Sequence, residues 1–181
     1  MGERQKHGFT YEKQIIEKMG IIPSNDYTSE WDGFLNDIPV SIKLEQYGSD
    51  IELADYFRNS KKNQDFYLIV GFWEKEKTNI IEERILLIAG QEWQSLFNES
   101  FTIRFKELLN NITNDYSDDE KWRKSISELR KDWKEQTPNL IRPRFKRDHR
   151  AQKRIQCAIN NKDFYTYFIP KYQVKEDIIS V

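Results

Sequence analysis

The chain has 181 residues, of which 33% are charged and 14% aromatic, with a net charge of −1 at pH 7 and a mean hydropathy of −0.84. This length suits one domain with a substantial core, and no stretch stays apolar for the roughly 18 residues that a membrane span needs. The single cysteine, Cys157, excludes an internal disulfide, and two histidines leave no ligand set for a zinc site. The N-terminal segment lacks the apolar core of a secretory signal, so we expect a cytoplasmic protein.

In the first half of the chain, hydrophobic periodicity predicts a helix, a strand hairpin, a second helix and two buried strands. The first helix is expected to end at Gly20, and Asn36 and Asp37 are expected to form the hairpin turn. Ser49 or Asp50 is expected to cap the second helix, IELADYFRNSKK. The elements expected in this half lie at residues 9–19, 27–35, 39–45, 51–62, 66–73 and 84–89.

The second half is expected to be mostly helical. Its predicted helices lie at residues 90–97, 101–109 and 118–135. The TPN segment at residues 137–139 ends the last of them and divides a single domain into a core at residues 1–136 and a C-terminal region at residues 137–181. We expect the C-terminal region to be basic and mostly helical, with a strand only at FYTYFI. The predicted fold class is therefore α/β, with a mixed β-sheet core flanked by helices.

Positive charge is concentrated between residues 141 and 154. Seven basic residues stand there against one acid, Asp148, which gives 7 − 1 = +6 in a chain that is acidic elsewhere. Such a run can be no more than a solvated face, but it also provides the attraction that a DNA backbone requires. Most members would contact phosphates and one or two would contact base edges. The candidates for DNA contact are Arg142, Arg144, Lys146, Arg147, Arg150, Lys153 and Arg154.

The hairpin gathers polar side chains on one face. A connecting loop of two or four residues would place five of them together: Glu30, Asp32, Ser41, Lys43 and Glu45. A loop of three residues would instead turn Trp31 toward Lys43. The plain alternative is a solvent-facing hairpin with a cross-strand ion pair, worth about 0.2–1 kcal/mol.

The helices on either side of the hairpin bring further acids toward it. Glu12 lies on the first helix, and Glu52, Asp55 and Asn59 are spaced to share one face of the second. Like charges that converge require a cation, and oxygen ligands without histidines favour Mg2+. The chain has no glycine-rich phosphate loop, so its chemistry would depend on carboxylates, lysines, hydroxyls or such a metal ion.

The cysteine and one pair of adjacent lysines are expected to have structural roles only. Cys157 is expected to be a buried small hydrophobe. Lys61 and Lys62 suit the C-terminal end of the second predicted helix, where positive charge is favourable, and need no functional role there.

The hairpin and its flanking helices resemble the PD-(D/E)xK nuclease superfamily, and within it the small type II restriction endonucleases. In that family a helix precedes a strand hairpin that carries the first acid on one strand and a (D/E)-x-K tripeptide on the other. The resemblance covers roughly residues 8–90 and implies a restriction-endonuclease-like core. It implies that Asp32 is the first acid, that Lys43 of the SIK tripeptide is the catalytic lysine, and that Glu12 is the glutamate of the opening helix.

Ser41 departs from the family pattern, because it holds the second acidic position without a carboxylate. Some relatives with serine there supply the acid from the following helix, which implies Glu52 or Asp55 as the metal ligand beside Asp32, with Glu45 a third candidate. The resemblance then implies Mg2+-dependent, sequence-specific cleavage of double-stranded DNA by a homodimer. A nuclease of the resolvase or repair type and a non-catalytic DNA-binding module remain alternatives.

Overall fold

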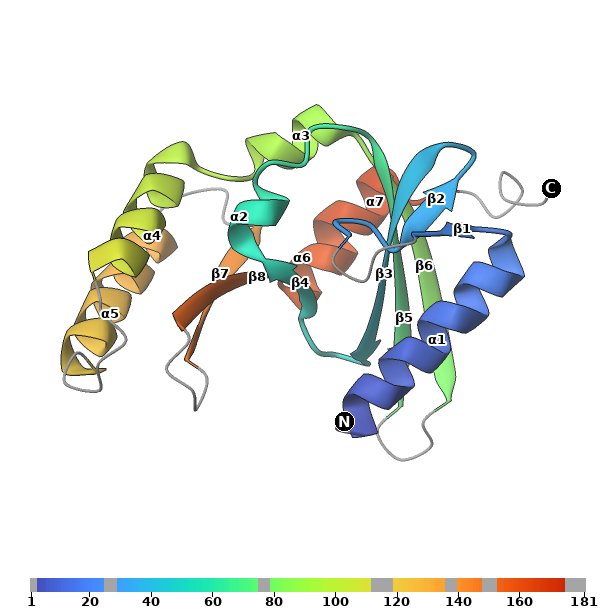
Figure 1. Ribbon diagram of the computed structural model, residues 1–181, viewed down its shortest axis with the longest axis horizontal. Coiled ribbons are helices and arrows are strands. Elements are labelled where there is room, and N and C mark those ends of the chain that lie inside the picture. The colour runs from blue at the N-terminus through green and yellow to red at the C-terminus, as the bar shows by residue number, and fades with distance from the viewer. Residues whose placement is uncertain are drawn as a thin grey trace.

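The structure is a computed structural model of a mixed α/β protein, in which helices flank a five-stranded and a three-stranded sheet (Figure 1). Most strand pairs are antiparallel. No helix in the described part of the chain is long and apolar enough to cross a bilayer. The described residues are 3–24, 29–74, 79–111, 119–135, 140–147 and 153–174.

Helices and strands alternate along the chain without forming a repeat. The helices are α1 (Glu3–Met19), α2 (Tyr56–Asn59), α3 (Gly90–Ser95), α4 (Glu99–Asn111), α5 (Asp119–Glu135), α6 (Asn161–Asp163), a π-helical turn (Phe164–Phe168) and α7 (Ile169–Tyr172). The strands are β1 (Ile22–Pro23), β2 (Gly33–Leu35), β3 (Ile38–Gln46), β4 (Ile51–Asp55), β5 (Phe66–Trp73), β6 (Ile80–Ile88), β7 (Ile141–Arg147) and β8 (Lys153–Ile159).

Strand β3 lies at the centre of the larger sheet, whose order is β1-β2-β3-β5-β6. It pairs antiparallel with β2 and parallel with β5. The chain between β3 and β5 leaves this sheet, because β4 joins the smaller antiparallel sheet β4-β8-β7. Strands from the two predicted regions, 1–136 and 137–181, therefore pair with each other.

The two faces of the larger sheet contact different apolar clusters. On one face Tyr67 and Ile69 of β5 meet Tyr11 of α1. On the other face Leu68 and Val70 join a cluster that includes the inner face of the small sheet and helices α3, α4 and α5. Both faces of β5 are thus buried, as its continuous apolar run predicts.

The structure confirms the first helix, the strands predicted at residues 66–73 and 84–89 and the three helices of the second half. The second strand, β6, is an edge strand and is not buried on both faces as expected, since Leu87 is 37% exposed. Gly20 ends α1 with a φ of 65°, the left-handed conformation that glycine adopts without strain. Cys157 is buried as expected, on strand β8. Within the helix predicted at residues 51–62, only Tyr56–Asn59 is helical, as α2, and the prediction is wrong for residues 51–55, which form β4. Ile51 and Leu53 are buried and Glu52 between them is part-exposed, a period of two, and pairing with β8 makes this segment a strand.

The prediction of a mostly helical basic C-terminal region is also wrong. Basic and other side chains alternate along β7, which pairs with β8 in register over seven residues. Ile141 is buried while Arg142 beside it is exposed, so the period is that of a strand. The FYTYFI segment is a π-helical turn leading into α7 rather than a strand.

Candidate functional site

The hairpin turn is two residues long, one of the two even lengths considered from the sequence. Leu35 pairs with Ile38, and positions 36 and 37 have φ of 49° and 64°, as a type I′ turn requires. This register brings Asp32 next to Ser41. Asp32 itself precedes β2, because that strand begins at Gly33 and not at residue 27 as predicted.

Asp32 is fixed against β3 by its carboxylate. Oδ2 accepts a hydrogen bond of 2.6 Å from the amide of Ile42 and lies 3.6 Å from the Nζ atom of Lys43. The Lys43 ammonium also donates to the carbonyl of Ile42 at 2.9 Å. The side chains of Lys43 and Asp32 are only 22% and 29% exposed, so this ion pair is half-buried and not a solvent-facing surface pair.

A polar cleft of about 280 Å3 opens beside this pair. It lies between the hairpin, the β4–α2 junction and strand β8. Ser41 and Gln156 are neutral polar residues that line the cleft. Its acids are Glu30, Asp32 and Asp55, and its cations are Lys43, Arg58, Lys62 and Arg154.

Asp55 lies in the cleft at the end of a bulged strand. The register between β4 and β8 shifts between Glu52 and Ala54, and Ala54 has a φ of 66°. This left-handed conformation costs a residue with a Cβ about 1–2 kcal/mol, so the surroundings must hold it. The side-chain amide of Asn59 donates to the carbonyls of Leu53 at 2.7 Å and Asp55 at 2.8 Å, on either side of Ala54.

Asp55 also caps helix α2. Its Oδ1 accepts a hydrogen bond of 2.7 Å from the amide of Arg58, which fixes the direction of the carboxylate. Asp32 and Asp55 thus present carboxylate oxygens to one cleft from two separate elements, and this donor chemistry fits Mg2+. Within the described ranges no three acid, histidine or cysteine side chains form a cluster that could hold a metal ion.

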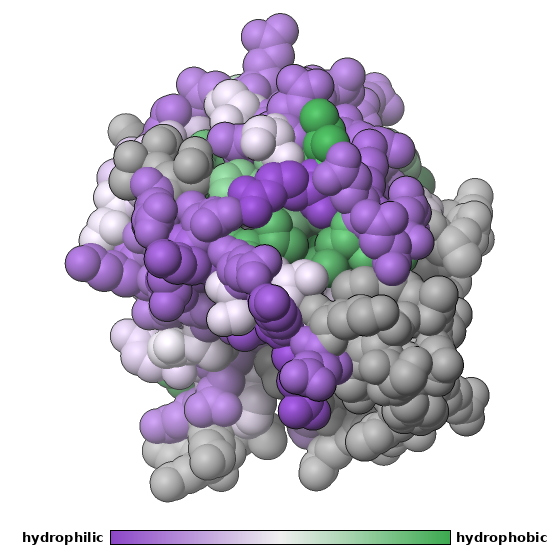
Figure 2. Space-filling view, turned by 90° about the vertical axis from the view of Figure 1, so that its left-hand side faces the viewer, coloured by the Kyte–Doolittle hydropathy of each residue, from purple (hydrophilic) through white to green (hydrophobic). Residues whose placement is uncertain are grey.

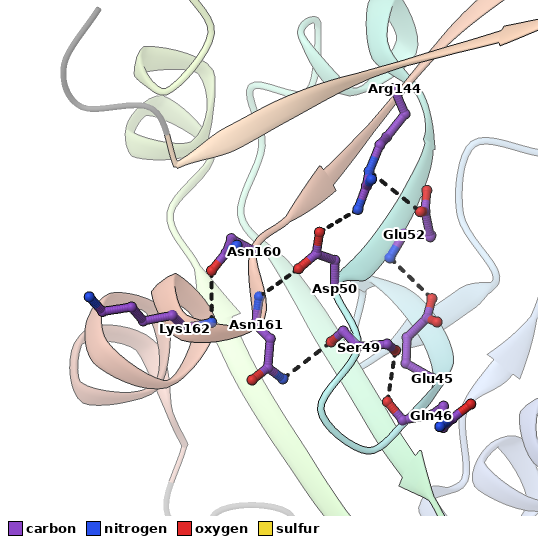
Figure 3. Close-up of polar contacts among 9 residues, drawn as sticks. All are labelled: Glu45, Gln46, Ser49, Asp50, Glu52, Arg144, Asn160, Asn161 and Lys162. Atoms are coloured by element: carbon purple, nitrogen blue, oxygen red, sulfur yellow. Dashed lines mark hydrogen bonds and ion pairs between the residues drawn. The ribbon is translucent and has the colours of Figure 1, made fainter. Parts of the chain in front are cut away.

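The other two acids proposed as metal ligands do not line the cleft. Glu45 is 4% exposed and accepts a hydrogen bond of 3.0 Å from the amide of Glu52 (Figure 3). The Glu52 carboxylate lies 3.7 Å from Nε of Arg144, whose Nη2 donates to Asp50. Asp50 in turn accepts from the amide of Asn161 at 3.0 Å, so these contacts join β4 to β7 and α6.

Glu12 of α1 lies close enough to the hairpin acid to interact with it electrostatically. Burial raises the pKa of Glu12, the negative charge of Asp32 raises it further, and the positive charge of Lys43 opposes both effects. The opening helix therefore brings its glutamate toward the Asp32–Lys43 pair.

Lys62 also lines the cleft, although the sequence pattern predicted no role for it in the site. Its side chain is 6% exposed, and its Nζ lies 3.9 Å from the centre of a Trp31 ring. Interpreting Lys62 as the charge at a helix end was wrong, because α2 ends at Asn59 and the lysine points inward. Its burial depends on a contact between residues 31 apart in the chain, and nothing in the local spacing signals it.

The charge of Lys62 is destabilised by its surroundings. Burial and, to a lesser extent, the positive charge of Lys43 lower its pKa to about 8, against the opposing effect of Glu30 and Asp32. An ammonium group with this pKa remains mostly charged at pH 7 but is held there at a cost in free energy.

The basic residues of the small sheet divide between two roles. Arg142, Arg144 and Lys146 alternate onto one face of β7, and the register places Lys146 beside Arg154 of β8. Arg144 is occupied by its ion pairs with β4, whereas Arg142 is exposed. Arg150 lies outside the described residues, as do the side chains of Arg147 and Lys153.

A row of paired residues connects the cleft to this basic face. Asp55 of β4 pairs with Gln156 of β8, which pairs with Arg144 of β7.

Comparison of the chain with protein-family models, with curated proteins and with solved structures found no match.

Replacing Lys62 with methionine is expected to stabilise the protein at pH 7. The folded-state pKa of Lys62 is about 8, below the usual 10.5, so the unfolded chain binds the proton more strongly than the folded protein does. The charged lysine therefore destabilises the folded protein, and this destabilisation is at its full size below pH 8. The gain in the free energy of unfolding is up to about 3 kcal/mol and disappears as the pH approaches 10.5. Urea denaturation at several pH values measures it, and a difference that stays constant with pH would contradict this assignment.

Arg144→Ala is expected to lower the free energy of unfolding by about 1–2 kcal/mol, because Asp50 and Glu52 would lose their cation. The matched control is Arg142→Ala on the same strand face, which should change stability by less than about 0.5 kcal/mol. Urea denaturation compares the two, and equal effects would show that the ion pairs of Arg144 do not hold β7 to β4.

Proposed function

We propose that this chain is a metal-dependent endonuclease of the PD-(D/E)xK type that cuts double-stranded DNA at a specific sequence, as type II restriction enzymes do. The observation that carries the proposal is the single cleft shared by Asp32, Ser41 and Lys43 of the hairpin and Asp55 of the β4–α2 junction. The order of α1, the β2–β3 hairpin and β5 parallel to β3 also supports a restriction-endonuclease-like core. Glu12 adds the acid of the opening helix.

The side chains of the cleft suit hydrolysis of a phosphodiester. Asp32 and Asp55 would hold Mg2+, which when bound polarises a phosphate and makes a coordinated water more acidic. Asp32 is preoriented for this by its bond to the backbone of β3, and Asp55 by its cap on α2. Lys43 orients the attacking water and stabilises negative charge that develops on the phosphate oxygens. The Ser41 hydroxyl contributes a hydrogen bond to water in place of the missing carboxylate.

The polar face of the small sheet suits the DNA backbone. Arg154 lines the cleft, Lys146 lies beside it on β7, and Arg142 continues the basic face. Helix α5 adds Arg130 and Lys134, which border a groove of about 580 Å3 next to β7. The side of the molecule that carries α5 and β7 is predominantly hydrophilic (Figure 2). Positive charge along this path would bind phosphates, and two-stranded β-ribbons are among the elements that read DNA grooves.

Cleavage of both strands at a palindromic site requires two such clefts. Two copies of the chain related by a two-fold axis would present identical surfaces to the two half-sites. The partners in this proposal are therefore double-stranded DNA and a second copy of the chain.

Purified protein is expected to cut unmethylated phage DNA into discrete fragments with Mg2+ and to leave it intact with EDTA. Lys43→Ala should slow this cutting at least about 100-fold, since each 1.36 kcal/mol lost from transition-state stabilisation is a factor of ten. Gel electrophoresis measures both. Salt-sensitive DNA binding without any cutting would favour a binding module, and cutting without a fixed sequence would favour a repair or resolvase nuclease.

Asp55→Asn is expected to reduce Mg2+-dependent cutting at least about 100-fold, because an amide oxygen is a much weaker ligand than a carboxylate. Asparagine caps helices as well as aspartate does, so the fold should be unaffected. Glu52→Gln is the matched control and should retain activity. Loss of cutting in Glu52→Gln, with Asp55→Asn active, would move the second metal ligand to Glu52.

A further inference from the structure

Lys62 is the most buried cation of the cleft, and the hydrolysis described above leaves it unused. Burying an ammonium group costs several kcal/mol unless it is paired. In the described part of the chain its Nζ has no ion pair, and it lies over the rings of Trp31 and Phe66, 3.9 Å and 5.2 Å from their centres. Desolvated ring contacts of this kind contribute on the order of 2 kcal/mol, less than the several kcal/mol that burial of an unpaired ammonium group costs.

Lys62 lies in the part of the cleft where a bound anion would also contact the hairpin residues Asp32 and Lys43. Trp31 directly precedes Asp32, and Lys62, whose ammonium lies over the Trp31 ring, lines the same cleft as Asp32 and Lys43. The charges of Glu30, Asp32 and Lys43 all act on it. An ammonium group has three N–H donors, and those that do not point at the rings are available for an acceptor in the cleft.

We propose that Lys62 is a second phosphate-binding residue of the cleft, whose ammonium group, supported by the Trp31 ring, donates to a non-bridging oxygen of a DNA phosphate beside Lys43. This inference rests on the proposed function, because its ligand is the DNA backbone. A lysine suits the position, since its compact charge binds phosphate as a point charge and its long apolar stem can be buried. Glu30 and Asp32 act on Lys62 without forming an ion pair with it, and an anion in the cleft would supply that direct partner.

The test is the salt dependence of duplex binding, measured with Ca2+ in place of Mg2+ so that no cutting takes place. Loss of one phosphate contact lowers the slope of log affinity against log salt by about 0.9. Lys62→Met should show this decrease. Lys61→Met, the adjacent exposed lysine, should keep the wild-type slope. Circular dichroism checks that both variants are folded, and the removal of a destabilising charge makes Lys62→Met a stable variant.

A wild-type slope in Lys62→Met overturns the proposal, and so does an equal decrease in Lys61→Met. A purely structural role for Lys62 would leave the slope unchanged. The test is independent of catalysis: absence of Mg2+-dependent cutting refutes the nuclease but does not alter the binding measurement. Wild-type protein that binds no duplex refutes both proposals.

Discussion

Strand β3 carries polar side chains on a face that is covered by protein. The partners that these side chains find there determine where the site lies. A buried polar group is costly unless it is hydrogen-bonded. Glu45 is satisfied by the amide of Glu52, which ties the start of β4 to β3. Lys43 is balanced by Asp32 at 3.6 Å. Ser41 faces the space that remains where β4 has turned away, and that space is the cleft.

The second constraint is the bulge in β4, which places strain next to the cleft. Ala54 holds a left-handed backbone because Asn59 bonds the carbonyls on either side of it. The chain can then turn into α2 with Asp55 as its cap. Arg144 of β7 also holds its strand to Asp50 and Glu52 on the β4 side of the small sheet, so the basic face of β7 keeps a fixed position relative to the cleft. Bulges and strained residues of this kind are frequent beside functional sites.

Local pattern was sufficient to predict much of the large sheet. The alternation along β3 predicted which side chains share a face with Asp32, whereas the two-residue turn that brings Asp32 next to Ser41 was one of two lengths left open. Continuous apolar runs gave β5 and most of β6. Pattern failed where a long-range partner decides the structure, since β4 is a strand only because β8 lies beside it. The basic run was interpreted as helical for the same reason, although its alternation has the period of a strand.

Which acids meet in the cleft could be predicted only in part. Asp32 and Lys43 follow from hairpin register, but the choice among Glu45, Glu52 and Asp55 depends on a bulge and on ion pairs with β7 that no spacing reveals. The account is tested most directly by locating Mn2+, which prefers the same oxygen ligands as Mg2+, in an anomalous difference map of crystals grown with it. We predict one peak within about 2.2 Å of carboxylate oxygens of both Asp32 and Asp55. A peak at Glu45 or Glu52, with the cleft empty, would contradict the account.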